Sequence, residues 1–289
     1  MIKIYAPAIK QDIGGGWTFL RNFKKGLSRY VQFVDRLEDC DLFFISGVTM
    51  VEPDDVTRAR EMGKPIVLRM DNIPRKSRNK RNRVYDNIKR YSELADIVVY
   101  QSKWAAWYCA PMSGPGEIIY NGIDQDIFNT KNLEDNGREN RYLFAYHGKS
   151  ELKQFWLAHY YFQTEARKNP NAEFWFIYNF KKELPELVDA NFDFWNGEKY
   201  KHLDFVDDPI QMAGIMKQCK YLIFPSTVDA SPNTVLEARA CGMEILYPAP
   251  ADVSGTKELL ELSDISLDRM AREYNALFEL ILGSKDVEI

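Results

Sequence analysis

Short apolar runs rich in β-branched and aromatic residues recur along the chain, and each is followed by a stretch long enough for a helix. Runs of this kind predict buried β-strands that alternate with helices. In the first half, strands are expected over residues 2–6, 41–45, 65–69 and 97–100. A strand, a helix and another strand form a crossover unit, so the pattern is typical of a parallel sheet.

A second set of apolar runs predicts another parallel sheet. Its strands are expected over residues 142–146, 173–178, 202–206, 221–224 and 244–247. The stretch NTKNLEDNGREN, residues 129–140, separates the two sets and is polar, without hydrophobic periodicity. We therefore predict an α/β protein with two Rossmann-like domains, residues 1–128 and 141–265, joined by this linker. Residues 266–289 follow, and there SLDRMAREYNALFELIL predicts an amphipathic helix.

The composition is that of a globular chain. Of 289 residues, 45% are hydrophobic and 13% are aromatic, which excludes a disordered protein. The cysteines have no CxxC spacing and lie in or beside apolar stretches, so we interpret them as reduced core residues: Cys40, Cys109, Cys219 and Cys241. No apolar run is as long as a membrane span, and the opening residues lack a signal-peptide core. We expect a cytoplasmic protein without integral membrane association.

Charge is distributed unevenly along the chain. The formal net charge is −4, yet residues 1–130 carry 20 Lys and Arg against 16 Asp and Glu. The segment RKSRNKRNRVYDNIKR, residues 75–90, holds eight basic side chains, and a helix would place Val84, Ile88, Tyr91 and Ala95 on one apolar face. Such a segment is either a solvated helix face or a site for an anionic acceptor, such as a lipid head group, a phosphorylated glycan or a nucleic acid.

Two predicted strand-to-helix loops carry groups suited to a phosphate, because ligands of parallel sheets bind at the carboxyl ends of the strands. After the first strand, Gly15 and Gly16 belong to a glycine run that opens a helix, either as a phosphate loop or as a tight turn. After the strand at 142–146, Lys149 and Lys153 flank the start of a helix. They are either diphosphate ligands or solvated lysines.

The stretch FPSTVDASPNTVLEARACGMEIL predicts a strand, a loop and a helix. Ser231 is expected to cap a helix that begins near Pro232 and ends before Gly242. Asp229 then lies in the loop, and Glu237 lies in the second turn with no basic residue at helical spacing. A half-buried carboxylate is costly unless a group outside the helix satisfies it, and sugar hydroxyls would do so.

The same stretch resembles the nucleotide-sugar signature of retaining glycosyltransferases of family 4, in the GT-B class. In that family an acid, seven residues and a glutamate precede an Ala-x-Ala-x-Gly helix. Asp229 and Glu237 have this spacing, and Ala238, Ala240 and Gly242 follow in order. IIYNGIDQDIF is similar to the Asn-Gly-Val-Asp segment that closes the family's first domain, and IVVYQSKW resembles its strand-then-serine element.

The resemblance implies a GT-B fold whose C-terminal helix packs back on the first domain. It also implies a transferase that moves a hexosyl or pentosyl group from a UDP- or GDP-sugar to an unknown hydroxyl acceptor. The anomeric configuration would be retained, and neither a metal ion nor a cofactor besides the donor would be needed. The leaving phosphate would itself help to take the acceptor's proton, so no dedicated base is expected.

The resemblance assigns roles to individual residues. Lys149, which stands where the family has an arginine, and Lys153 would stabilise the leaving diphosphate. Glu237 would bind the ribose, and Asp229 would bind the transferred sugar. The other donor-binding candidates are Gly15, Gly16, Asn179, Phe180, Val206, Ser231, Asn233 and Thr234. The acceptor-side candidates are Asp71, Arg69 and Lys103.

Alternatives remain open at this level. The triplet Asp124-Gln125-Asp126 matches the DxD metal signature of the other large glycosyltransferase fold, but it is embedded in the NGIDxxxF segment, so we predict no metal site. The same chemistry on an anionic acceptor, such as a modified nucleobase in DNA, is one alternative. A nucleotide-sugar epimerase of the same fold, which would need a further acid or base, is another. The third is a sugar-nucleotide-binding module without turnover.

Overall fold

The computed structural model describes residues 1–9, 14–71, 73–74, 83–133, 137–146, 153–177, 199–203 and 206–285. The chain forms two compact units. The first contains residues 1–123, 229–231 and 258–289, and the second contains residues 124–228 and 232–257. The division after Ile123 precedes the stretch 129–140, which the sequence suggests as a linker.

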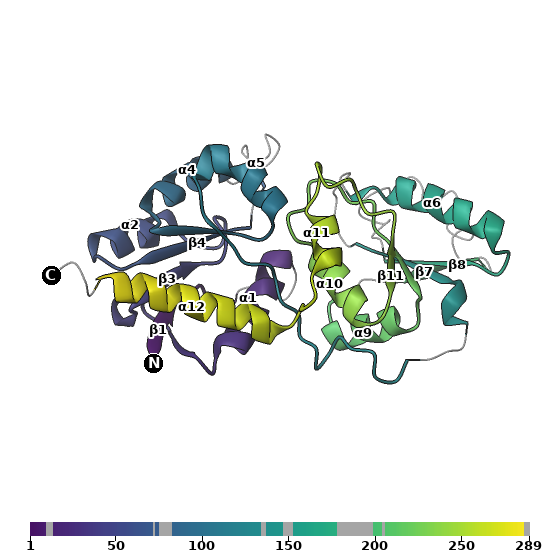
Figure 1. The fold of residues 1–289 in the computed structure, drawn as a ribbon, viewed down its shortest axis with the longest axis horizontal. Helices are drawn as coiled ribbons and strands as arrows, with labels where there is room; N and C mark the ends of the chain where they lie inside the picture. Colours follow the sequence, from purple (N-terminus) through teal and green to yellow (C-terminus); the bar gives the residue numbers. More distant parts are fainter. Residues whose placement is uncertain are drawn as a thin grey trace. The chain divides into compact units, whose positions relative to one another are not determined.

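The first unit is built on a six-stranded sheet with parallel pairings throughout, in the order β2-β1-β3-β4-β5-β6. Its strands are β1 (Ile2–Tyr5), β2 (Val31–Val34), β3 (Leu42–Ile45), β4 (Ile66–Met70), β5 (Ile97–Tyr100) and β6 (Glu117–Ile118). Its helices are α1 (Gly15–Leu27), α2 (Pro53–Glu61), α4 (Val84–Leu94), α5 (Lys103–Ser113) and α12 (Leu267–Lys285), with the 3-10 turn η1 (Leu37–Asp39). Right-handed crossovers place α1 on one face of the sheet and α2, α4 and α5 on the other, because the chain crosses the sheet in both directions (Figure 1).

The core of the first unit lies between α1, the sheet and α12, which runs beside α1 in Figure 1. Every residue of β3 is fully buried, as expected of a strand covered on both faces. Phe23 of α1 stacks on Phe44 of β3 with ring centroids 4.1 Å apart, and Tyr274 of α12 meets Phe23 edge-on at 5.1 Å. Gly26 lets the two helices approach, because a Cβ there would lie 3.2 Å from the Leu267 carbonyl oxygen.

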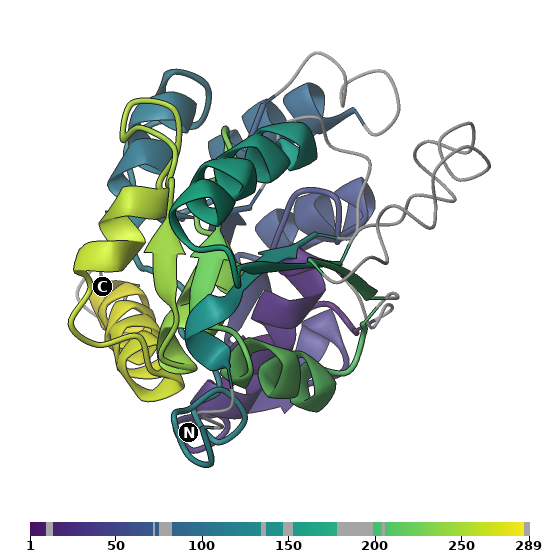
Figure 2. The ribbon, with the colours of Figure 1, turned by 90° about the vertical axis from the view of Figure 1, so that its right-hand side faces the viewer.

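The second unit is built on a five-stranded parallel sheet in the order β11-β10-β7-β8-β9. Its strands are β7 (Arg141–Ala145), β8 (Glu173–Ile177), β9 (Tyr200–Leu203), β10 (Tyr221–Ile223) and β11 (Glu244–Leu246). Its helices are η2 (Arg138–Asn140), α6 (Phe155–Lys168), α9 (Pro209–Lys217) and α10 (Asn233–Ala240), and α11 (Thr256–Glu261) lies at the boundary of the two units. α6 and α9 lie on opposite sides of the sheet (Figure 2), as right-handed crossovers require when the chain reverses its direction across a sheet.

Aromatic rings and one buried arginine hold the second unit together. Phe162 of α6 stacks on Phe174 of β8 with centroids 4.8 Å apart, and both rings are almost fully buried. Arg138 is 8% exposed, and its guanidinium donates to the Gly242 carbonyl (2.7 Å) and the Lys217 carbonyl (3.0 Å). The end of the stretch 129–140 is therefore fixed into this unit.

Each strand that the hydrophobic pattern predicts overlaps an observed strand, with shifted boundaries, while the predicted strand positions 178, 204 and 205 lie outside the described residues. β2 and β6 were not expected, because both are short and carry few buried residues. The predicted apolar face of the basic segment is confirmed at Val84, Ile88 and Tyr91, which are fully buried, whereas Ala95 follows the end of α4 and is only partly buried. The four cysteines are free and buried, as expected. None of the described helices is both long and apolar enough to cross a membrane.

Candidate functional site

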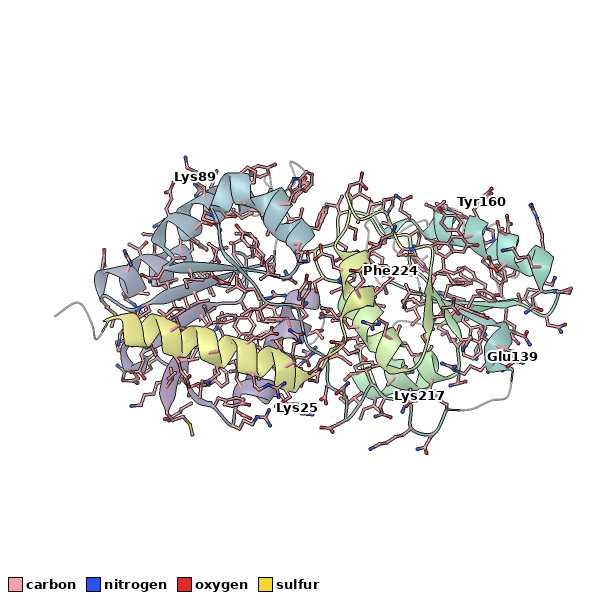
Figure 3. The ribbon with its side chains drawn as sticks, in the orientation of Figure 1. Lys25, Lys89, Glu139, Tyr160, Lys217 and Phe224 are labelled. Atoms are coloured by element: carbon pink, nitrogen blue, oxygen red, sulfur yellow. The ribbon has the colours of Figure 1, made fainter. Side chains whose placement is uncertain are left out.

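The carboxyl edge of the second sheet gathers three aromatic side chains. Tyr247, Phe224 and Tyr146 follow β11, β10 and β7, which are neighbouring strands. Parallel strands end at the same edge, so these residues lie next to one another there. Backbone pairing extends beyond the strands, because the Phe224 N–H donates to the Leu246 carbonyl (3.0 Å) and the Tyr146 N–H to the Ile177 carbonyl (3.0 Å). Phe224 is labelled in Figure 3.

Lys153 reaches this edge from the segment between β7 and α6. Its Nζ lies 5.2 Å from the centre of the Tyr146 ring and 5.4 Å from the centre of the Phe224 ring. Both distances are within the range of a cation–π contact. The chain turns immediately afterwards, because Gln154 has left-handed backbone angles (φ 59°, ψ 51°) at the N-cap position of α6. An ammonium group is therefore held over the ends of two strands.

Left-handed backbone angles recur along the same edge. Gln154 (φ 59°), Val228 (φ 52°) and Tyr247 (φ 55°) follow β7, β10 and β11, and none of them is glycine. Val228 is the most strained, because a β-branched residue rarely adopts this conformation, and its N–H donates to the Val253 carbonyl (2.8 Å). Such residues cost on the order of 1–3 kcal/mol each and cluster at functional sites. This edge is therefore a candidate site.

α10 begins at Asn233 with Pro232 in the N-cap position, so the prediction that Ser231 caps this helix is wrong. The physical reason is that Pro232 keeps extended backbone angles (ψ 112°), and its own carbonyl accepts from the Val235 N–H (3.1 Å). Ser231 is 7% exposed, and its Oγ makes no hydrogen bond within the described residues. The N-cap position of α10 makes no side-chain cap hydrogen bond, and the first turn of the helix, which contains Asn233 and Thr234, follows the loop after β10.

Glu237 lies in the second turn of α10. Its side chain is partly buried, and in the part of the chain that the structure describes its carboxylate makes no hydrogen bond or ion pair. The residues at helical spacing are Asn233 and Cys241, neither of which is basic. Burial raises the pKa of the Glu237 carboxyl to about 7. A carboxylate that has lost water without gaining donors is suited to a ligand that brings hydroxyl groups.

Asp229, the other acid of the motif, is partly exposed and directly follows Val228. With Ala230 and Ser231 it belongs to the first unit, whereas Glu237 belongs to the second. Asn121 fixes this short segment, because its Nδ2 donates to the Ser231 carbonyl (3.3 Å). The two acids are therefore carried by different units of the chain.

The carboxyl edge of the first sheet carries Asp71, which directly follows β4. A Cβ on Gly47 would overlap the Asp71 carboxylate, and a Cβ on Gly16 would lie 3.4 Å from its Oδ2. Gly16 belongs to the first turn of α1, which begins at Gly15 and which no described side chain caps. We call Gly16, Gly47 and Asp71 the glycine cradle. It places a carboxylate beside the start of α1.

Arg69 is directed into the first unit rather than towards its surface. It is 2% exposed, and its guanidinium donates to the Ser46 carbonyl (3.0 Å), Gln101 Oε1 (2.6 Å) and Asn121 Oδ1 (3.2 Å). It also lies 3.5 Å from the centre of the Phe19 ring. Burial lowers the pKa of Arg69. The side chain thus holds together the segments after β3, β5 and β6, a role different from the acceptor contact that the sequence suggests.

Lys103 is the first residue of α5, and its side chain is exposed. The N–H groups at this helix terminus already have acceptors within the protein. Glu258 accepts from the Lys103 N–H (2.8 Å), the Trp104 N–H (2.7 Å) and the Tyr120 hydroxyl (2.8 Å). The Ser102 hydroxyl accepts from the Ala105 N–H (3.0 Å). The start of α5 is therefore filled by side chains of the protein itself. Sequence reasoning missed Glu258 because 155 positions separate it from Lys103.

The segment that matches DxD forms a turn. Asp124 is 7% exposed, its Oδ1 accepts from the Asp126 N–H (3.2 Å), and its carbonyl accepts from the Phe128 N–H (2.8 Å). Among the described residues, no group of three His, Cys, Asp or Glu could hold a metal ion. The absence of a metal in the reaction stays a prediction.

Of the remaining candidates, Lys149, Asn179 and Phe180 lie outside the described residues, whereas Val206 and Gly15 lie within them. Val206 follows β9 and is buried (6% exposed). Gly15 has open space around it, because a Cβ there would contact nothing within 4 Å. Lys153 therefore lies at the carboxyl edge of the second sheet and Glu237 lies on α10, which follows β10, while the first sheet carries the glycine cradle.

Two parallel α/β units, with a C-terminal helix that returns to the first, define the GT-B fold, as expected. No protein-family model and no curated protein sequence matches the chain. Solved structures match it along almost the whole length. Several of them are glycosyltransferases, and the identities are low enough that the similarity defines the fold alone.

Three of these structures are informative. HepE of Anabaena, solved with UDP-glucose, has a TM-score of 0.65 at 15% identity, covering 96% of this chain and 90% of that chain. Sucrose-phosphate synthase of Thermosynechococcus elongatus has a TM-score of 0.70 at 11% identity, covering 98% and 100%. An α-glucosyltransferase solved with UDP and a 13-mer DNA containing an HMU base has a TM-score of 0.60 at 12% identity, covering 98% and 92%.

Proposed function

We propose that the protein is a retaining glycosyltransferase of the family 4 type, which transfers a sugar from a UDP- or GDP-sugar to a hydroxyl acceptor. The observation that carries the proposal is the Glu237 carboxylate, which is partly buried and makes no hydrogen bond within the described residues. It lies on the helix that follows β10 of a parallel sheet, in a fold whose solved examples include complexes with UDP and UDP-glucose. Ribose hydroxyls would supply the donors that this carboxylate lacks.

The diphosphate of the donor would lie at the same edge. Lys153 brings positive charge there, and Lys149 would add a second cation. The first turn of α10, which contains Asn233 and Thr234, favours an anion through the helix dipole. The buried Ser231 hydroxyl is available to a phosphate or sugar oxygen.

The other parts of the donor are assigned by position along the second sheet. The base would be read near Asn179, Phe180 and Val206, which follow neighbouring strands. Asp229 would accept hydrogen bonds from the transferred sugar. The backbone of Gly15 and Gly16, at the uncapped start of α1, would approach the phosphates.

The proposed chemistry breaks the bond between the anomeric carbon and the diphosphate oxygen, and forms a bond from that carbon to the acceptor oxygen on the same face. The leaving phosphate takes the acceptor's proton. Negative charge grows on the phosphate as the bond breaks, and Lys153 together with the amides of α10 would stabilise it. Because these groups supply the positive charge, the proposal needs no metal ion and no cofactor.

The acceptor hydroxyl would donate to Asp71 in the glycine cradle. A carboxylate at this position favours an uncharged hydroxyl over a phosphate, because like charges repel. Lys103 is exposed and available to an acceptor, whereas Arg69 would act by holding the surrounding segments.

A nucleic-acid acceptor is the second candidate. It is favoured by the similarity to a glucosyltransferase solved with a modified DNA, and by the basic segment 75–90. Lys89 and Arg90 of this segment are exposed on α4, and Lys89 points outward in Figure 3. Binding through phosphates would weaken steeply with salt.

The proposal is tested by incubating the protein with UDP-, GDP- and ADP-glucose and following the nucleotide and the sugar by NMR. Donor-dependent release of a nucleoside diphosphate, with the α configuration of the donor kept in the first sugar product, supports a retaining transferase. Sugar isomerisation without release would indicate an epimerase, and binding without turnover would indicate a binding module. Absence of binding to all three donors would overturn the proposal.

A further inference from the structure

Two aromatic rings hold Lys153 at the carboxyl edge of the second sheet. We infer that Tyr146 and Phe224 are positioning residues, which hold the Lys153 ammonium where it meets the donor diphosphate. The inference rests on the proposed function, and it concerns how this chain prepares its site before a ligand arrives. A lysine side chain loses rotamer entropy when a ligand orders it, so holding it in advance reduces the cost of binding.

The two rings are themselves fixed. Phe224 is 5% exposed, and its N–H donates to the Leu246 carbonyl of the neighbouring strand (3.0 Å). Tyr146 packs against the aromatic core of the second unit, and its N–H donates to the Ile177 carbonyl (3.0 Å). The backbones of both residues therefore extend the sheet, and Lys153 lies over two rings carried by adjacent strand ends.

Aromatic rings suit this purpose better than an acidic side chain would. A ring attracts an ammonium through its quadrupole and adds no formal negative charge. A carboxylate at the same place would compete with the diphosphate for the lysine and would repel the diphosphate itself. The two ring contacts of Lys153 therefore leave an anionic ligand without a competing charge from these rings.

Tyr146→Leu and Phe224→Leu test the inference, because leucine keeps an apolar side chain but has no ring quadrupole. Affinity for UDP is measured by calorimetry, and affinity for uridine by ligand-observed NMR. Each leucine variant is expected to weaken UDP binding about two- to fivefold, in line with a partly exposed cation–π contact, and to leave uridine binding unchanged. Tyr146→Phe, which keeps the ring, is expected to bind UDP as wild type does.

Two controls separate positioning from general effects. Lys201 also lies over a ring, 3.7 Å from the centre of Trp175, so Lys201→Met removes a comparable contact away from the strand ends. Tyr160→Leu removes an exposed ring from α6, 59% exposed and labelled in Figure 3. Neither is expected to change UDP affinity. Thermal unfolding of each variant shows whether it is folded. If Phe224→Leu does not fold, Tyr146→Leu alone tests the inference.

The outcomes are distinguishable. If the wild-type protein binds none of UDP, GDP and ADP, the proposed function fails. If it prefers GDP or ADP, the same pairs are measured with that nucleotide and its nucleoside. If Lys153→Met weakens the diphosphate but both leucine variants bind it as wild type does, the inference is overturned. Equal weakening of UDP and uridine would also overturn it, because the rings would then act on the base or on the fold.

Discussion

Arg69 in the first unit and Glu237 in the second are both charged side chains removed from water, and their surroundings differ. Three hydrogen-bond acceptors and a phenyl ring surround the Arg69 guanidinium. Of its three nitrogens, only Nε lacks a hydrogen bond within the described residues. The Glu237 carboxylate makes no hydrogen bond there at all, and its pKa is raised to about 7 by burial. Both groups bear the cost of desolvation, but only Arg69 recovers it inside the fold.

The comparison teaches how to separate structural charges from ligand-directed ones in this chain. A buried charge that the fold satisfies holds neighbouring segments in place, and removing it should unfold the protein. A buried charge that the fold leaves unsatisfied lowers stability, and removing it should affect a ligand instead. Substitutions at the two positions should therefore have opposite effects on stability and on donor binding.

Arg69→Met is expected to have the largest effect. It leaves the Ser46 carbonyl, Gln101 and Asn121 without their common donor, at a cost of about 3–5 kcal/mol in the free energy of unfolding. Urea denaturation measures this loss. Arg83→Met is the control, because the Arg83 side chain is 81% exposed, and a change within about 0.5 kcal/mol is expected there. If both variants lost a similar free energy of unfolding, the structural role of Arg69 would be contradicted.

Glu237→Gln is expected to act in the opposite direction on stability. The carboxyl has a pKa of about 7 in the folded chain and 4.5 as its ordinary value, so the folded chain holds a proton between these values that the unfolded chain releases. Wild-type stability from this group is therefore complete below pH 4.5 and is lost as the pH rises through about 7. The glutamine variant should be as stable as wild type near pH 4.5, and more stable above pH 7 by at most about 3 kcal/mol. Urea denaturation at a series of pH values checks this difference, and a constant difference would contradict it.

The Glu237 carboxyl should also make donor affinity depend on pH, but in the opposite direction to its effect on stability. The ionised carboxylate accepts ribose hydroxyls, so wild-type affinity for UDP-glucose is expected to rise about tenfold between pH 6 and 8, as the ionised fraction grows through a pKa of about 7. The glutamine variant should bind more weakly at pH 8 and show little pH dependence. Calorimetry with UDP-glucose measures both. An identical pH profile in the two proteins would exclude Glu237 from the donor site.

Gly47→Ala is expected to have an intermediate effect, because its Cβ would overlap the Asp71 carboxylate. Overpacking of this kind costs about 1–3 kcal/mol, and displacement of Asp71 should reduce transfer to an acceptor while leaving slow hydrolysis of UDP-glucose intact. Gly214→Ala is the matched control, since its Cβ would meet nothing within 4 Å in α9 and alanine favours a helix. Loss of hydrolysis together with transfer in a folded Gly47→Ala protein would argue against an acceptor role for Asp71.

The hydrophobic pattern was enough to predict both sheets, because buried parallel strands read as continuous apolar runs. β2 and β6 were not predicted, because neither is a continuous buried run. β2 has one buried residue of four, and both residues of β6 are exposed. The start of α10 was misplaced because Ser-Pro suggests a cap followed by a first turn, whereas the extended angles of Pro232 make it the cap position.

The site could be predicted only where its determinants are local in sequence. Glu237 was recognisable because an acid without basic neighbours at helical spacing is visible in one helix. Arg69 was not interpretable in this way, because its partners Gln101 and Asn121 are 32 and 52 positions away. Tyr146 and Phe224 end their predicted strands, a position that marks the ligand edge of a parallel sheet, yet their contact with Lys153 depends on the turn at Gln154.

Ser231→Ala is expected to have the smallest effect on the fold. Its buried Oγ makes no hydrogen bond within the described residues, so removing it should change the free energy of unfolding by less than about 0.5 kcal/mol. Ser113→Ala is the matched control, because Ser113 is equally buried but bonded to the Tyr100 hydroxyl (2.8 Å) and the Cys109 carbonyl (2.9 Å), and a loss of about 1–2 kcal/mol is expected there. Affinity for UDP-glucose should fall about two- to tenfold in Ser231→Ala alone, since one hydrogen bond to the donor is removed. If both variants lose stability equally and neither changes donor affinity, an unsatisfied buried group in this chain does not mark a ligand.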